Sequence, residues 1–402
     1  MTEKSKPDAA KAAKPKKQWS NPALRAMGIP RFSLPSRNWM IFCSVLASVG
    51  GSIYYDKQQQ KAVRDRYVAQ VAHLANEECA ANRLPRKLTV FIAPPPNDFL
   101  EESLRHFRRY IKPILDAAAI DFDVYTEMRQ GDIRAQVAEK IRQLRRAQAE
   151  QQRAAAEKQV QEAREHSWRP EHLVSRAELY EVKDLLGLYR VVEPTKPVCD
   201  HVDDAALCGG VVCIGRGSYK EYLTGIHEGF LGPLEAPVVE AGLVGASKIS
   251  QKSELFDADA SSDAQLSVPV PFISATDYKN CVLAPEFDFS QNILSKDGVP
   301  VLFEQPVYVF PVPKISGFTR IPEKIYNYFT RRKLAEDVSE KTLVVVHGKS
   351  RPFEYKDKYL ASEEELDWPK KWVEKGKAKK SEWVQKLEVD DRVTRRLRVF
   401  DR

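Results

Sequence analysis

The most constraining feature of the sequence is an uncharged stretch near its N-terminus. No charged residue lies between Asn38 and Tyr55, and from Trp39 the chain reads WMIFCSVLASVGGSIYY. Eighteen residues in a helix span roughly 27 Å, close to the thickness of a bilayer's hydrocarbon core. Trp39 begins the apolar run and Tyr54 and Tyr55 end it, and such amphipathic rings favour the membrane interface. The sequence therefore predicts a transmembrane helix over 39–55.

Two other interpretations of this stretch are a secretory signal and a buried core helix. The residues that precede it are too many for the polar region of a signal peptide, and no small-residue cleavage site follows before Tyr54. A signal-anchor that stays attached to the protein is the favoured interpretation.

Small residues recur at intervals of four along the same stretch. Ser44, Ser48 and Ser52 share one helical face, and Ala47 and Gly51 are also four apart. This spacing lets a second membrane helix approach closely, as in GxxxG pairs. The pattern predicts packing against the helix of a partner, and the alternative is that the small residues are incidental.

The net positive charge is confined to the start of the chain. The whole sequence has 63 Lys and Arg against 56 Asp and Glu, a net charge of +7. Residues 1–38 hold nine basic and two acidic residues, so the rest is neutral with 54 of each. A basic tail on a neutral body fits the positive-inside rule better than a nucleic-acid-binding face. We therefore expect 1–38 on the matrix or cytoplasmic side, the rest across the membrane, and no nucleic-acid partner.

Beyond a polar, helix-prone stalk over 57–83, strand-like and helix-like segments alternate. This alternation predicts one α/β domain over 84–402, a mainly parallel sheet flanked by helices. Short apolar, β-branched runs predict strands at 87–93, 122–126, 187–192, 210–215, 307–312 and 342–347. Helical patterns begin near Asp98 and Gly131 and cover 219–230, 323–338 and 382–393.

Two segments differ in composition from the rest of this domain. The chain is rich in Ala, Gln, Glu and Arg around 148–175, and rich in Ser, Asp, Ala and Gly over 241–268. We expect flexible insertions in both places, with a long solvated helix continuing into the first.

The cysteines do not follow a metal-binding pattern. Cys199, Cys208 and Cys213 are separated by eight and four residues, with His201 beside the first. Zinc sites normally bring ligands in close pairs such as C-x2-C, so we expect no metal. Buried free thiols are favoured, and a single disulfide within this cluster stays open.

The segment Gly215-Arg216-Gly217 lies where a strand is expected to meet a helix. Backbone N–H groups at such a junction can hold phosphate. The pattern is not G-x-G-x-x-G, because position 220 is Lys, and the Walker pattern occurs nowhere. A structural turn is favoured over a nucleotide-binding loop. The same candidate interaction or structural region includes Tyr219, Tyr222, His227 and Glu228.

The stretch 367–383 combines three tryptophans with six lysines. Aromatic rings among cations can stack on bases or lie on an anionic membrane. Neighbouring glutamates dilute the charge. We therefore favour a loop fixed to the core by Trp368, Trp372 and Trp383, with contact to a partner as the alternative.

No set of residues in the sequence assembles a nucleophile, a base and an orienting group. The seven histidines are scattered, and H-E-x-x-H is missing. We expect a protein that works by binding, without a catalytic residue or a cofactor.

The chain contains, in this order, the runs Asn21–Leu24, Gly28–Pro30, Leu34–Phe42, Pro85-Arg86, Thr89–Asp98, Gly215–Gly217, Tyr219–Tyr222, Gly225–Gly229, Asp367–Lys370 and Trp372-Val373. Together these runs closely resemble the fungal Tim54 family, and the resemblance spans nearly the whole chain. The linkers around 150–175 and 241–270 are short for that family.

The resemblance implies a non-enzymatic, single-pass subunit of the carrier translocase of the mitochondrial inner membrane. Its N-terminus would lie in the matrix and its C-terminal domain in the intermembrane space. Family members lie beside the channel-forming subunit and help dock small chaperone complexes that deliver carrier precursors. The family is also associated with assembly of an intermembrane-space AAA protease. The alternatives are a scaffold for that protease and a membrane-tethered enzyme that uses the Gly215–Gly217 turn.

Overall fold

The structure is a computed structural model of the 402-residue chain. It describes residues 36–77, 85–168, 208–236, 269–287, 289, 293, 300–379 and 381–401, with side chains of the long helix α5 described as far as 161. The chain divides into two compact units, residues 1–55 and 56–402.

The second unit is built on a six-stranded sheet with the order β2-β1-β3-β4-β6-β5. All neighbouring strands are parallel except β5, which pairs antiparallel with β6 at one edge. This confirms the predicted α/β class with a mainly parallel sheet. The strands are β1 (Lys87–Ile92), β2 (Asp121–Thr126), β3 (Gly209–Ile214), β4 (Val307–Phe310), β5 (Ser350–Pro352) and β6 (Arg398–Phe400).

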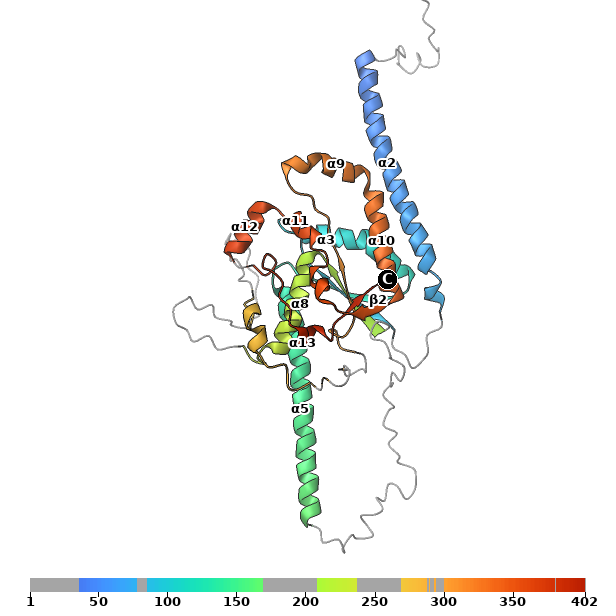
Figure 1. The fold of residues 1–402 in the computed structure, drawn as a ribbon. Coiled ribbons are helices and arrows are strands. Elements are labelled where there is room, and N and C mark those ends of the chain that lie inside the picture. Colours follow the sequence, from blue (N-terminus) through green and yellow to red (C-terminus); the bar gives the residue numbers. More distant parts are fainter. Residues whose placement is uncertain are drawn as a thin grey trace, which may run out of the picture. The chain divides into compact units, whose positions relative to one another are not determined.

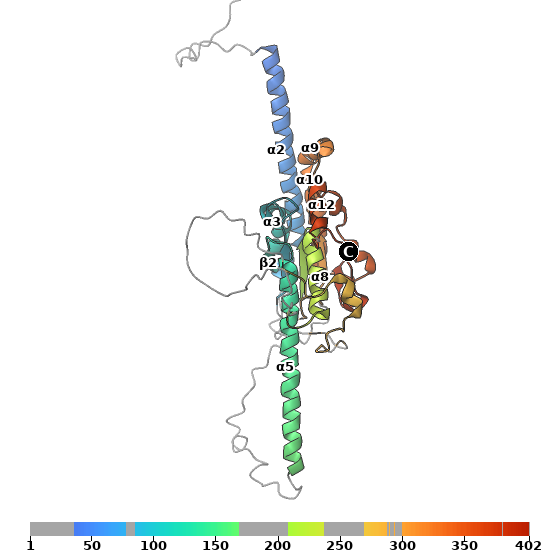
Figure 2. The same cartoon turned by 90° about the vertical axis from the view of Figure 1, so that its left-hand side faces the viewer.

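Helices cover both faces of the sheet (Figures 1 and 2). Because successive side chains of a strand point to opposite faces, the strands feed two separate cores. Phe91, Val211 and Cys213 pack with α5 (Asp132–Trp168) and α8 (Arg216–Leu231). The alternating residues Val90, Ile92, Val212 and Ile214 pack with α3 (Leu100–His106), the π-helical turn η2 (Phe107–Ile111), α4 (Lys112–Ala117) and α10 (Arg331–His347).

Helix α2 runs from Arg37 to Val71 without a break. Its side chains between Trp39 and Tyr55, the stretch that the sequence singles out, are almost all exposed. Beyond Asp56 the helix packs on the second unit, where Tyr67 and Val71 are buried. In the part of the chain that the structure describes, no helix combines the length and the apolarity needed to cross a membrane.

One predicted strand is wrong. Residues 342–347 form the end of α10, although they include a β-branched run. Ala335, Val338, Thr342 and Val345 are buried at helical intervals, so the apolar period of the helix continues through the run. Gly348, with φ +70°, then ends the helix in the left-handed conformation.

One predicted helix is also wrong, and another is divided. Residues 382–390 are irregular, because Trp383 and Leu387 enter the core singly rather than along a helical face, and only α13 (Asp391–Thr394) is helical. The helix predicted over 323–338 is split at Thr330 into α9 (Ile321–Phe329) and α10. The predicted strand 187–192 and the insertion 241–268 lie outside the described residues.

Candidate functional site

The carboxyl edge of the sheet between β1 and β3 is the first place to expect a ligand. The chain passes from β1 to β2 on one side and then to β3 on the other, so the strand order reverses there. In open α/β sheets, ligands bind outside the carboxyl ends of the strands at such a switch point. The Gly215–Gly217 segment directly follows β3 and lies at this edge.

Both glycines of this segment are required by the structure, for different reasons. Gly215 has φ +90°, a conformation that favours glycine, and α8 begins at the next residue. Gly217 lies inside α8, and a β-carbon there would come within 2.6 Å of the ring of Trp383. The chain can adopt this turn only because positions 215 and 217 are glycines without side chains.

The N-terminus of α8 is already occupied by a carboxylate of the same chain. Glu364, in α11 (Glu363–Leu366), accepts hydrogen bonds through Oε2 from the backbone N–H of Arg216 at 2.9 Å and of Val312 at 3.1 Å. Burial raises the pKa of Glu364 to about 7. A phosphate at this turn would have to displace that side chain.

The guanidinium of Arg216 is also used within the chain. Its Nε donates to Glu365 Oε1 at 2.7 Å and its Nη1 donates to the carbonyl of Leu360 at 2.8 Å. The side chain is 3% exposed. Arg216 could help to hold an anion at the Gly215–Gly217 turn, but its guanidinium is instead bound to α11 and to the turn that precedes α11.

Little space remains at the switch point. The cavity there has a volume of about 10 Å³, and its lining includes Pro94, Gly215, Glu364 and Trp383. That is room for about one water molecule. The crevice that holds ligands in other doubly wound folds is filled here by residues from the C-terminal part of the chain.

The three predicted tryptophans lie together against this edge. The ring centroids of Trp368 and Trp372 are 5.4 Å apart, and Trp383 lies 6.5 and 6.1 Å from them. The indole Nε1 of Trp383 donates to Glu221 Oε1 at 2.5 Å. The carbonyl of Trp383 accepts from Lys220 Nζ at 2.6 Å. The cluster thus joins the C-terminal segment to α8.

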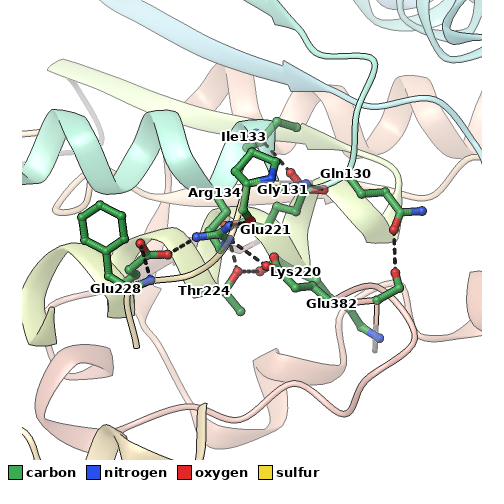
Figure 3. A network of polar contacts seen from close by, with 12 residues as sticks. Gln130, Gly131, Ile133, Arg134, Lys220, Glu221, Thr224, Glu228 and Glu382 are labelled. Atoms are coloured by element: carbon green, nitrogen blue, oxygen red, sulfur yellow. Dashed lines mark hydrogen bonds and ion pairs between the residues drawn. The ribbon is translucent and has the colours of Figure 1, made fainter. Parts of the chain in front are cut away.

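Glu221 forms the centre of a buried polar network between α5 and α8 (Figure 3). Besides Trp383, its carboxylate accepts from the backbone N–H of Gly131 at 2.8 Å and of Ile133 at 3.1 Å. It therefore caps the N-terminus of α5, where a negative charge is favourable. Burial raises the pKa of Glu221 to about 7.

Glu228, two turns further along α8, neutralises two buried arginines of α5. It forms an ion pair with Arg134 and accepts from Arg142 Nη2 at 2.6 Å. Arg134 Nε also lies 2.8 Å from Glu382 Oε1. Two cations and two anions balance in this part of the core, so losing one partner leaves a buried charge.

The other α8 residues that the sequence singled out are buried in contacts within the chain. His227 Nδ1 donates to the carbonyl of Leu223 at 2.7 Å, and its Nε2 accepts from the Asp390 N–H at 2.9 Å. Burial lowers the pKa of His227 below its usual value. The hydroxyls of Tyr219 and Tyr222 donate to backbone carbonyls. These contacts leave no reactive group open to solvent on this helix face.

Sequence reasoning missed Glu221, Glu364, Arg134 and Arg142. A signal was present for three of them. Glu221 lies seven residues before Glu228, and Arg134 lies eight before Arg142, so each pair shares a helical face with apolar residues. Glu364 had no such signal, because its contacts come from segments far away in the sequence.

A separate, open pocket of about 340 Å³ lies beyond the end of β1. Its lining mixes prolines and aromatic rings with polar side chains, and Phe99 and Met128 in it are highly exposed. Asp98, its one carboxylate, is paired with Lys314. The lining residues are Pro94, Pro95, Pro96, Asn97, Asp98, Phe99, Met128, Gln130, Trp372 and Trp383.

Metal-binding groups do not gather anywhere in the described ranges, since no three of His, Cys, Asp and Glu approach closely enough to hold an ion. Cys208 and Cys213 are free thiols, and Cys213 is buried in β3. Cys199 lies outside the described residues.

Along its whole length the sequence is similar to subunits of one import machinery. The family model described as inner membrane protein import complex subunit Tim54 matches residues 21–255 and 244–400. The mitochondrial import inner membrane translocase subunit TIM54 of Candida albicans is 52% identical, with 98% of this chain and 100% of the relative covered. The same-named protein of Debaryomyces hansenii is 46% identical over 98% and 93%, and that of Saccharomyces cerevisiae 37% over 100% and 98%.

Proposed function

The chain belongs to the Tim54 family of inner membrane import complex subunits, and from this premise we propose that it is a non-enzymatic subunit of the translocase that inserts multi-spanning carrier proteins. It acts by binding, in the mitochondrial inner membrane. Its partners are the channel-forming subunit and the small intermembrane-space chaperone complexes that deliver the precursors.

The observation that carries this proposal is the occupied switch point. Glu364 takes the backbone donors of α8 that an anion would need, and Trp383 packs over Gly217. Charged groups in the same region are paired with each other rather than aimed into a cleft. An α/β domain whose ligand crevice is filled by its own chain is suited to binding other proteins at its surface.

In this proposal, residues 39–55 anchor the protein, with 1–38 in the matrix and the larger unit in the intermembrane space. Ile41, Phe42 and Leu46 are each more than half exposed, so this part of α2 offers an apolar surface that water does not favour. Ser and Gly residues reduce its mean hydropathy. They are also the residues that let a second helix approach, which supports contact with the channel-forming subunit.

The proposal is tested by depletion and replacement in mitochondria that import a carrier precursor. The tagged chain should migrate with the channel-forming subunit on native gels, and its removal should reduce carrier insertion while matrix-protein import continues. Separate migration of the chain, or unchanged carrier insertion after its removal, contradicts the proposal.

The enzymatic alternative is tested on the same protein in detergent. ATP, GTP and NAD should not raise its melting temperature, because Glu364 already occupies the turn. Arg216→Ala should impair folding and carrier import together, since it removes contacts to Glu365 and Leu360. Micromolar nucleotide binding, with import lost in Arg216→Ala but folding intact, would instead assign a nucleotide site to the turn.

A further inference from the structure

A stripe of apolar side chains on α9 and the turn before it is left uncovered. Phe318, Ile321, Ile325 and Tyr328 follow helical spacing, and they are 88%, 39%, 54% and 45% exposed. No residue of α9 is buried. A surface helix normally packs such a stripe on the core. The stripe on α9 is therefore suited to contact an apolar surface that the described residues do not provide.

The same segment is strongly basic. Residues 314–333 contain six Lys or Arg and one acidic residue, Glu323, which pairs with Arg320 at 2.7 Å. Lys333 Nζ donates to the Tyr326 hydroxyl at 3.0 Å, and Arg331 lies over the ring of Tyr328 at 5.0 Å. Amphipathic aromatics mixed with cations are the composition of helices that lie on anionic membranes.

The position of α9 is set by the start of α10. Asp56, which directly follows Tyr55, accepts a hydrogen bond through Oδ1 from the backbone N–H of Arg332 at 3.2 Å. Further along, Arg66 pairs with Glu336 at 2.8 Å, so α10 runs alongside α2 in the same direction. The junction between α9 and α10 therefore lies beside Asp56, the first residue after the uncharged stretch of the sequence.

The two helices do not continue into one another. Thr330, with φ −124°, separates them, and α9 runs in a different direction from α10 (Figure 1). The stripe on α9 therefore does not continue the face by which α10 packs on the core, and it stays uncovered by the described residues of the second unit.

We propose that α9 is an interfacial helix that inserts its apolar stripe among the lipids at the membrane surface and binds anionic phospholipid headgroups through its basic residues. The proposal rests on the anchor over 39–55 proposed above. Lys324, Arg331 and Lys333 supply the headgroup contacts, since none of them forms an ion pair with a carboxylate of the described residues.

The test uses the full chain in vesicles of phosphatidylcholine alone or with cardiolipin, both carrying nitroxide-labelled lipid. A fluorescent amino acid replaces Phe318, Phe42 in the anchor, or the control Tyr355, which is 62% exposed and distant in sequence. Nitroxide should quench the probes at Phe318 and Phe42 several-fold more than the probe at Tyr355. Cardiolipin should increase the quenching at Phe318.

Charge variants separate the headgroup contact from a general effect. The combined changes Lys324→Gln, Arg331→Gln and Lys333→Gln should reduce quenching at Phe318 in cardiolipin vesicles and leave Phe42 unchanged. The matched control neutralises three exposed lysines of α12 (Lys370–Ala378), and it should have no effect. The control changes are Lys370→Gln, Lys371→Gln and Lys377→Gln.

The outcomes distinguish this inference from the proposed anchor. Quenching at Phe42 without quenching at Phe318 overturns the interfacial helix and leaves the anchor standing. No quenching at either site overturns the anchor. A photoreactive residue at Phe318 in intact membranes that forms adducts with a protein and not with lipid would show that a partner helix covers the stripe, and would also overturn the proposal.

Discussion

Trp383 and Gly217 are in direct contact, and a β-carbon on Gly217 would lie 2.6 Å from the indole ring. This contact joins the C-terminal segment to the first turn of α8, where Glu364 holds the backbone N–H of Arg216. The carboxyl edge of the sheet is thus closed by a segment about 150 residues further along the chain. The stability of the unit therefore depends on a position that resembles a ligand-binding turn.

We expect Gly217→Val to destabilise the larger unit. The new side chain overlaps the ring of Trp383, and overpacking of this kind costs about 1–3 kcal/mol in a well-packed core. The free energy of unfolding, measured by urea titration of the full chain in detergent, should fall by that amount.

Gly50→Ala is the matched control for this change, because a β-carbon at Gly50 meets nothing within 4 Å. It should leave the urea midpoint of the larger unit unchanged. Equal midpoints for Gly217→Val and the natural chain would show that the Trp383 ring moves away without cost.

The parallel sheet was accessible from sequence because its signals are local. The strand formed by Val211, Val212, Cys213 and Ile214 is a continuous apolar run, as expected of a strand buried on both faces. The helices that follow it have regular apolar periods. In contrast, residues 342–347 satisfied the strand pattern and the helical pattern at once, and only the buried positions on α10 decide between them.

The candidate site was less accessible, because its groups meet only through tertiary structure. The sequence singled out Gly215, Arg216 and the tryptophans, but gave no reason to connect them. Glu364 looks like one of several acidic residues in a solvated run. Its burial depends on Val312 and Arg216 presenting backbone donors at one point, which no local pattern encodes.

The buried carboxyls predict a pH dependence of stability. The pKa values of Glu221 and Glu364 are raised to about 7 in the folded state, above the usual value of 4.5. The folded state then binds more protons than the unfolded state between about pH 4.5 and 7, so their contribution to stability falls as the pH rises through this window. Each contributes about 1–3 kcal/mol to that fall.

Urea midpoints at pH 5 and pH 8 check this prediction. Glu221→Gln removes one titrating group, so the loss of stability between the two pH values should be smaller in the variant. Buried His106 and His227 act in the opposite sense, since their lowered pKa values reduce stability as the pH falls. The histidines are the same in the variant and the natural chain, so their contribution cancels in the difference between the two free energies of unfolding. If that difference is the same at pH 5 and pH 8, the pKa of Glu221 is not raised.

Removal of Arg134 should be far more costly than removal of an exposed arginine. Arg134 is 2% exposed and faces both Glu228 and Glu382, so Arg134→Met leaves Glu382 without its cation and the buried Glu228 with Arg142 alone. Breaking a buried pair in this way costs about 3–5 kcal/mol. Arg66→Met, which breaks an ion pair with Glu336 in which both side chains are 53% exposed, should cost about 0–1 kcal/mol.

The two variants are compared by urea unfolding under the same conditions. Because a buried pair can also be replaced rather than broken, the double change Arg134→Met with Glu382→Leu, which keeps the Arg142–Glu228 pair, should recover part of the loss. If Arg134→Met is no more destabilising than Arg66→Met, the network does not hold α5 to α8.

The small residues of α2 form an exposed helix face. Ser48 and Gly51 are exposed, and a β-carbon at Gly51 meets nothing within 4 Å. If this face packs on a helix of the channel-forming subunit, the combined change Ser48→Leu and Gly51→Leu should keep the segment in the membrane but prevent close approach. The translocase should then dissociate more readily on native gels, while alkaline extraction still leaves the chain in the membrane fraction.

Val45→Leu with Val49→Leu is the matched control, since it adds apolar volume to the same helix outside the small-residue pattern. If the Ser48/Gly51 variant and the Val45/Val49 control dissociate equally, added bulk rather than the loss of the small-residue face weakens the complex. If the complex stays intact in both variants, this part of α2 serves only as an anchor.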